Sequence, residues 1–144
     1  MEWPVTYERK VRFSDTDAQG VVFNGMYATY FDDTVTDYFD AIGVPWSDLN
    51  ASGHDMVLAR TEIDFRSSGR LGEVLVTGAR VKRIGNTSLV FELRTWEEAS
   101  GRTVAEAVQV QVIVDHTTFK PVAVPSFLSD AVMRSQGPLP EGGS

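Results

Sequence analysis

Two aspartates just ahead of an apolar segment are the residues best suited to chemistry in this sequence. Asp15 and Asp17 stand in the stretch SDTDAQG, which leads into a long run of apolar and aromatic residues. An aspartate has an ordinary pKa of about 3.9 and is ionised at neutral pH, so it can attack an electrophilic carbon or accept a proton from water. Spacing alone favours a solvated acidic loop that caps a helix, because acidic loops are common.

The apolar run that follows has the spacing of one helical face. Its members are Phe23, Met26, Tyr27, Tyr30, Phe31, Val35, Tyr38, Phe39 and Ile42. Asn24 suits the N-cap, Gly43 suits the position after the C-terminus, and Pro45 blocks continuation. The unpaired N–H groups of a helix N-terminus therefore lie shortly after Asp17, where they can stabilise an oxyanion.

The rest of the chain is typical of strands. An alternating pattern predicts a strand over residues 4–13, with Val5, Tyr7, Arg9, Val11 and Phe13 on one face. Further strands are expected at 56–65, 73–84, 89–95 and 104–115, and short helices at 46–49 and 126–133, with Ser126 as an N-cap. This order predicts an α+β fold, in which an antiparallel sheet of about five strands wraps around one long central helix. The exposed sheet edges favour a dimer or larger oligomer.

Composition limits the class of protein. A chain of 144 residues suits a single domain, expected at 1–135, and the Gly- and Pro-rich residues 136–144 indicate a disordered tail. The net charge of −7 argues against binding to nucleic acid or to anionic membranes. The absence of Cys excludes thiolate metal sites and a thiol nucleophile. No signal peptide or membrane-spanning run is evident, so we expect a cytoplasmic protein without membrane insertion.

Two motifs resemble one enzyme family. The stretch from Asp15 to Tyr27, DTDAQGVVFNGMY, is similar to the D-x-D-x-x-G-x-V signature of hotdog-fold acyl-CoA thioesterases of the 4-hydroxybenzoyl-CoA thioesterase branch. Residues 81–91, VKRIGNTSLVF, resemble a second hairpin of that family, and the likeness covers roughly residues 5–128. It implies a hotdog fold, an acyl-CoA substrate, a homodimer or homotetramer with the site at the dimer interface, and no metal or cofactor.

The resemblance also implies roles for individual residues. Asp17 is expected to be the nucleophile or general base, and the backbone N–H of Asn24, more weakly that of Gly25, to polarise the thioester carbonyl. Asp32 is given a supporting role. The expected substrate-binding residues are Val22, Phe23 and Tyr27 for the acyl group and Arg80, Lys82, Arg83 and Ser88 for coenzyme A. The basic residues of this set fit a solvated strand face equally well.

The predicted reaction is hydrolysis of an acyl-CoA to the free acid and coenzyme A. Whether Asp17 attacks carbon or activates water is left open by the sequence, as is the acyl group. A non-catalytic acyl-CoA binding protein on the same fold is the alternative from another class. A hotdog hydratase or dehydratase is disfavoured, because such enzymes pair an acid with a histidine and His54 and His116 fall in distant elements.

Overall fold

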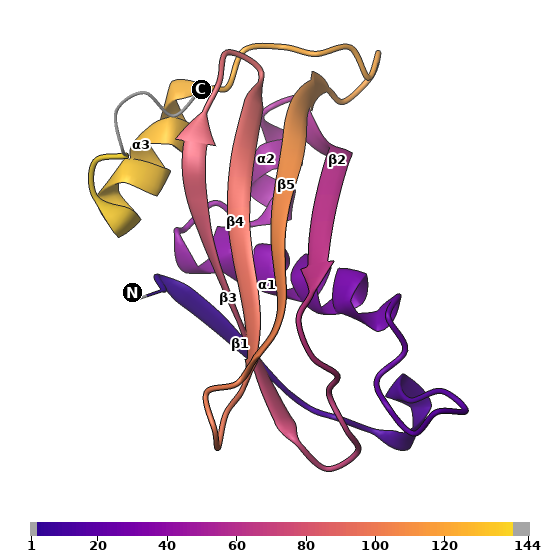
Figure 1. The fold of residues 1–144 in the computed structure, drawn as a ribbon. Helices are drawn as coiled ribbons and strands as arrows, with labels where there is room; N and C mark the ends of the chain where they lie inside the picture. The colour runs from indigo at the N-terminus through magenta and orange to yellow at the C-terminus, as the bar shows by residue number, and fades with distance from the viewer. Residues whose placement is uncertain (1–2, 140–144) are drawn as a thin grey trace.

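The chain folds into one five-stranded antiparallel sheet with helices, in a computed structural model that describes residues 3–139 (Figure 1). The elements in chain order are β1 (Val5–Lys10), a 3₁₀ turn (Phe13–Asp15), α1 (Met26–Ala41), α2 (Trp46–Ala51), β2 (His54–Phe65), β3 (Val74–Ile84), β4 (Ser88–Glu97), β5 (Thr103–Asp115) and α3 (Ser126–Gln136). The strand order is β1-β3-β4-β5-β2. The predicted antiparallel meander is therefore confirmed as β3-β4-β5.

Helix α1 covers one face of this sheet and supplies much of the core. Its buried residues are Tyr27, Tyr30, Phe31, Thr34, Val35, Tyr38 and Phe39. The rings of Tyr38 and Phe39 lie 5.3 and 5.8 Å from that of Phe91 on β4. The 16-residue helix packs chiefly on β1 and β3. In the described part of the chain, no helix is long and apolar enough to cross a membrane.

The ends of two N-terminal elements differ from the prediction. Helix α1 begins at Met26 with Gly25 as its N-cap, so Asn24 is not the cap. Strand β1 ends at Lys10, and Phe13 is 81% exposed in the 3₁₀ turn instead of extending the apolar face. After the strand, the Asp15 carboxylate accepts the Arg12 N–H and the Asp15 N–H donates to the Arg12 carbonyl, which closes the turn. Gly43, with φ of +83°, follows the helix as predicted.

Helix α3 is longer than predicted and ends in an ordered contact. It starts at Ser126 with Pro125 as N-cap, and it includes Gln136, which we had expected in the disordered tail. The Gln136 amide accepts from the Tyr38 hydroxyl (2.6 Å) and the Val81 N–H (3.1 Å) and donates to the Val81 carbonyl (2.6 Å). Pairing of β1 with β3 extends only to Ala79, so the Gln136 amide takes the place of a strand and pairs with the backbone of Val81. Residues 140–144 of the predicted tail lie outside the described residues.

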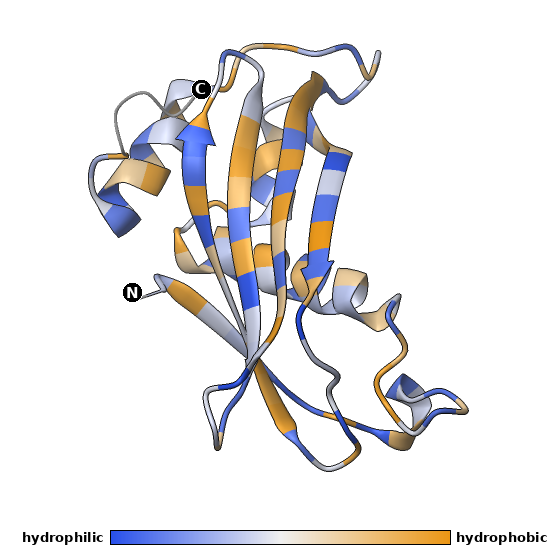
Figure 2. Cartoon of the chain, viewed as in Figure 1, coloured by the Kyte–Doolittle hydropathy of each residue, from blue (hydrophilic) through white to orange (hydrophobic). Residues whose placement is uncertain are grey.

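Strand β5 places two of its polar side chains on the buried face of the sheet. Hydrophobic and hydrophilic residues alternate along it, as Figure 2 shows. The glutamines nevertheless lie on the buried face, since Gln109 pairs with Phe91 and Gln111 with Leu89, both fully buried. The valines at 108, 110 and 112 are half-buried on the opposite face.

Candidate active site

The loop between β1 and α1 is held in shape by Asp15. Its carboxylate, 1% exposed, accepts hydrogen bonds from Arg9 Nε (3.0 Å), Arg9 Nη2 (2.7 Å) and the Arg12 N–H (3.0 Å). Its carbonyl accepts the Phe23 N–H (2.8 Å), which joins the start of the loop to its end. The Arg9 guanidinium holds the pKa of Asp15 below its usual range. Both carboxylate oxygens of Asp15 therefore serve to hold the loop in its conformation.

Asp17 stands in a tight turn with one carboxylate oxygen available. Its Oδ1 accepts the Gln19 N–H (2.9 Å), while its backbone N–H donates to the Val21 carbonyl (3.0 Å). Gly20 closes the turn with φ of +77°, a conformation that favours glycine. Within residues 3–139, Asp17 Oδ2 accepts no hydrogen bond. The turn thus fixes Asp17 and leaves its Oδ2 without a protein partner in the described part of the chain.

A hollow of about 270 Å³ opens beside Asp17. Its lining is Asp17, Gln19, Val21, Val22, Asn24, Tyr27, Phe65, Ser67 and Ser68. Two loops meet here, because the Val22 N–H donates to the Gly69 carbonyl (2.8 Å) and the Gly69 N–H donates to the Tyr27 hydroxyl (3.1 Å). Four of the site residues expected from the sequence therefore border one space: Asp17, Val22, Asn24 and Tyr27.

Two unused N–H groups occur where the loop enters α1. The N–H groups on either side of them are engaged, Phe23 with the Asp15 carbonyl and Met26 with the Phe23 carbonyl. Among the described residues, the N–H groups of Asn24 and Gly25 have no protein acceptor. Such donors at a helix N-terminus can stabilise a developing oxyanion. The Asp17 carboxylate and Asn24, which carries one of these N–H donors, thus line the same hollow.

Comparison with known proteins identifies the family. The profile of the thioesterase-like superfamily matches residues 11–132. This chain belongs to that superfamily. Its five-stranded sheet and covering helix are the superfamily's hotdog-type fold.

Individual members of the superfamily are moderately similar. Acyl-CoA thioester hydrolase YbgC of Escherichia coli O157:H7 is 28% identical over 123 residues, which are 85% of this chain and 88% of that protein. The chloroplastic acyl-acyl carrier protein thioesterase ATL3 of Arabidopsis thaliana is 27% identical over 119 residues; the match spans 83% of this chain and 62% of ATL3. A thioesterase of Thermus thermophilus, solved with coenzyme A and Zn, superposes with a TM-score of 0.81 at 26% identity, covering 94% of this chain and 96% of that one.

Two predicted residues of this thioesterase-like chain lie outside the hollow. The Phe23 ring folds against Gly25, where an added Cβ would lie 2.7 Å from it, and the phenylalanine is 51% exposed. Asp32 lies further along α1 on its exposed side. Although Asp32 is exposed, partial desolvation by the surrounding protein and then the charge of Asp33 raise its pKa. Neither residue lines the space beside Asp17.

The predicted coenzyme A contacts lie at the other end of the sheet. Arg80 pairs with Glu92 (3.1 Å) and covers the Trp3 ring at 5.4 Å. Lys82 lies about 27 Å along β3 from Val74, the end of the strand that is nearer the hollow. Arg83 and Ser88 flank the β3-β4 turn. Within one subunit these residues therefore lie far from Asp17.

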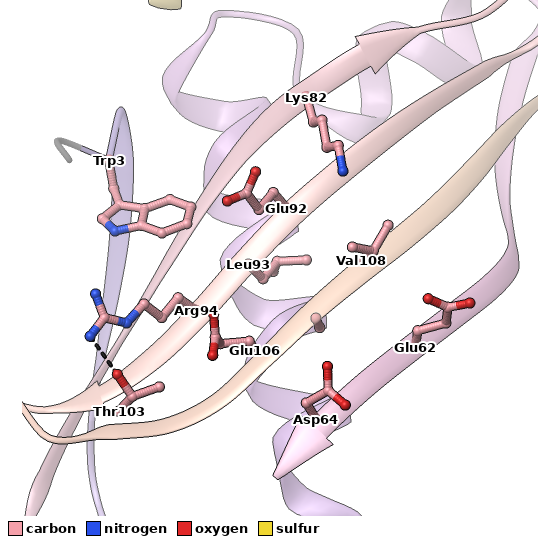
Figure 3. A pocket seen from close by; sticks show the side chains of 11 residues that line it. Trp3, Glu62, Asp64, Lys82, Glu92, Leu93, Arg94, Thr103, Glu106 and Val108 are labelled. Atoms are coloured by element: carbon pink, nitrogen blue, oxygen red, sulfur yellow. Dashed lines mark hydrogen bonds between the residues drawn. The ribbon is translucent and has the colours of Figure 1, made fainter. Parts of the chain in front are cut away.

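A larger hollow of about 440 Å³ lies on the outer face of the sheet, opposite α1 (Figure 3). Trp3, Lys82 and Arg94 line it together with four carboxylates, Glu62, Asp64, Glu92 and Glu106. This acidic excess disfavours the anionic phosphates of coenzyme A. The outer hollow also contains neither Asp17 nor a helix N-terminus, so the chemistry is assigned to the smaller one.

The sequence analysis missed five lining residues: Gln19, Val21, Phe65, Ser67 and Ser68. The only signal for the last two was the Ser-Ser-Gly break after a strand, which indicates a loop without saying what it faces. Arg70 follows directly and forms an isolated backbone bridge with Val21. Its side chain is exposed and forms no ion pair within residues 3–139. Arg70 is therefore an uncommitted cation whose backbone lies beside Val21, one of the residues that line the hollow.

Proposed function

We propose that the protein is an acyl-CoA thioesterase, which hydrolyses an acyl-CoA to the free carboxylic acid and coenzyme A. One observation carries this proposal: the open Oδ2 of Asp17 borders the same hollow as Asn24, at the unused N–H groups of the α1 N-terminus. The names of the Escherichia coli and Thermus thermophilus relatives support a thioester substrate.

Two routes use this geometry. In both, the thioester carbonyl oxygen accepts from the N–H of Asn24, with Gly25 as a second donor, and one such donor lowers the barrier by about 3–4 kcal/mol. As a nucleophile, Asp17 forms a mixed anhydride, expels the coenzyme A thiolate, and is released when water opens the anhydride. As a base, it takes a proton from the attacking water, and the thiolate leaves from the tetrahedral intermediate. Mass spectrometry after rapid quenching separates the routes, because only the first adds an acyl group to the protein.

We further propose a homodimer that forms through β2, with the site at the interface. Strand β2 lies at the edge of the sheet and pairs only with β5 in the described part of the chain. Its exposed apolar residues are Val57 (39%), Leu58 (43%) and Phe65 (54%). Phe65 also lines the hollow, so a partner that covers this edge would enclose the site.

Coenzyme A binding has two candidate sources of positive charge. Arg80, Lys82, Arg83 and Ser88 can serve only if the partner subunit brings its hairpin to the hollow, which antiparallel pairing of two β2 strands allows. Arg70 is available within the same subunit. Guanidinium groups bind phosphate oxygens in a bidentate manner, so Arg70 suits this role.

The hydratase alternative is poorly supported by the fold. His54 lies about 35 Å along β2 from Phe65, at the far end of the strand from Asp17. His116, although far from His54 in sequence and in a different element, lies beside it, since its N–H donates to the Gly53 carbonyl (3.1 Å). Within one subunit, both histidines are therefore too remote to act with Asp17.

Release of free thiol from a panel of thioesters tests the proposed function. The panel holds short, long and aromatic acyl groups on coenzyme A, and one acyl-acyl carrier protein. We expect thiol release from at least one acyl-CoA without added metal. Tight binding of an acyl-CoA with no release from any member would instead establish a binding protein.

A further inference from the structure

Two glutamines on β5 are buried where an apolar residue would be expected. Gln109 is 1% exposed and Gln111 is 5% exposed, and their neighbours on β4, Phe91 and Leu89, are fully buried. A buried amide is unfavourable unless its donors and acceptor are paired. Their placement on the inner face therefore requires an explanation.

The glutamines satisfy each other only in part. Gln111 Nε2 donates to Gln109 Oε1 at 3.3 Å, and within residues 3–139 neither side chain makes another hydrogen bond. The remaining amide nitrogen and carbonyl oxygen have no protein partner but keep some accessible surface, since the Tyr30 hydroxyl is the buried side-chain polar atom without a partner among the described residues. If both amide groups are rotated by 180°, so that nitrogen and oxygen exchange places, one donor and one acceptor still remain without a protein partner in the described part of the chain. A hydroxyl group, which accepts one hydrogen bond and donates another, complements this donor and acceptor.

The glutamines share a surface with the candidate active site. Phe65, which lines the hollow at Asp17, pairs with Ala105, and Ile63 pairs with Ala107, so small side chains form the floor between the hollow and Gln109. In the described part of the chain, this inner face is largely exposed along β2, whereas the β5 residues of the floor are buried.

The distance from the hollow suits an acyl chain. Thr61, the residue paired with Gln109, lies about 13 Å along β2 from Phe65. Thr61 and Leu58, which pairs with Gln111, are both exposed. A chain that runs from Asp17 along this floor therefore ends beside the two amides.

We infer that Gln109 and Gln111 form the far wall of the acyl site and select an aliphatic acyl group with a hydroxyl at its distal end. This inference rests on the proposed thioesterase function. Without that hydroxyl, the amides remain unpaired against an apolar chain end, and the site discriminates against the ligand.

Matched substrates test the inference. Each pair of acyl-CoA thioesters has one chain length and differs only in a terminal hydroxyl, and pairs of several lengths are compared. At the length that reaches the amides, we expect wild type to favour the hydroxylated member by about tenfold or more in kcat/KM. Gln109→Leu and Gln111→Leu should each remove that preference while the plain thioester is still hydrolysed. Val110→Leu, on the outward face between them, is the control and should retain it.

Equal kcat/KM values within every pair for the wild type would overturn the inference. A preference that persists in both leucine variants would also overturn it, because the glutamines would then serve only the fold. Calorimetric binding of the same pairs is measured in parallel. If no thioester is hydrolysed, the proposed function fails, while a binding preference for the hydroxylated member that Gln109→Leu abolishes still supports the glutamine wall.

Discussion

At the residue scale, the two aspartates of the D-x-D motif have separate tasks. Their spacing predicts that both lie near a helix N-terminus, and a family signature singles out Asp17. The spacing does not indicate that Arg9, six positions before Asp15, donates two hydrogen bonds to the Asp15 carboxylate. That contact depends on how β1 approaches the loop, and so only the fold reveals which carboxylate is left free.

Replacing Asp15 with Asn should destabilise the protein while leaving Asp17 in place. Removing one member of a buried ion pair leaves Arg9 without its partner, and we expect a loss of about 3 kcal/mol in the free energy of unfolding at pH 7. Asp130→Asn, on the exposed surface of α3, is the control and should have little effect. Urea denaturation measures both.

The same variant should alter the pH dependence of stability. The folded pKa of Asp15 is depressed, so its contribution is present above the unfolded pKa of about 3.9 and is lost as the pH falls through the lower folded value. The difference in unfolding free energy between wild type and Asp15→Asn should therefore shrink in acid. A difference that stays constant down to the acid transition would contradict this assignment.

One pair of alanine variants distinguishes Arg70 from Lys82 as the residue that binds coenzyme A. Arg70→Ala should raise the KM for acyl-CoA by about tenfold, the loss of one charge-assisted hydrogen-bonding group, with kcat little changed. Hydrolysis of the matching acyl-pantetheine, which lacks the nucleotide phosphates, should be unaffected. If Lys82→Ala shows this pattern and Arg70→Ala does not, coenzyme A is held by the partner's hairpin.

At the scale of elements, the periodicity of the sequence predicts single helices and strands but not the contacts between them. The apolar stripe of α1 and the alternation of β3, β4 and β5 follow from side-chain geometry within each element, and all four form. The orientation of β5 is different, because alternation does not say which face is inward, and the glutamines lie inside. The contacts of Gln136 likewise depend on a strand edge formed far away in sequence, so a Gly- and Pro-rich ending wrongly suggested disorder there.

Gln136→Ala should loosen α3 from the sheet. The change leaves the Val81 N–H and carbonyl and the Tyr38 hydroxyl without their partner, and each buried unpaired group costs about 1–3 kcal/mol before water compensates. We expect a lower midpoint in thermal denaturation and faster hydrogen exchange at Val81. The exposed neighbour Ser135→Ala serves as the control, and equal effects of the two substitutions would argue against this role.

At the scale of the whole molecule, the proposed dimer rests on an uncovered sheet edge next to the hollow. An edge strand with exposed apolar residues lies beside the hollow, and Phe65 belongs to both. The sequence predicts oligomerisation from an uncovered sheet edge. It cannot say which edge is used, since that depends on the strand order.

Leu58→Glu should separate the subunits and reduce activity together. A charge on the edge strand opposes burial of that edge, so we expect the monomer to dominate in analytical ultracentrifugation and thiol release to fall. Glu62→Gln, on the outer face of the same strand, should preserve both. Full activity in a monomeric Leu58→Glu protein would show that the site is complete within one chain.

The most direct test of the account is thiol release by Asp17→Asn. The amide oxygen can still accept the Gln19 N–H, so the turn and the acyl-CoA affinity should be retained. Hydrolysis should fall by about a hundredfold to ten-thousandfold, because Asn is neither a nucleophile nor a base. An unchanged kcat in a correctly folded Asp17→Asn protein would contradict the assignment of Asp17 as the reacting carboxylate.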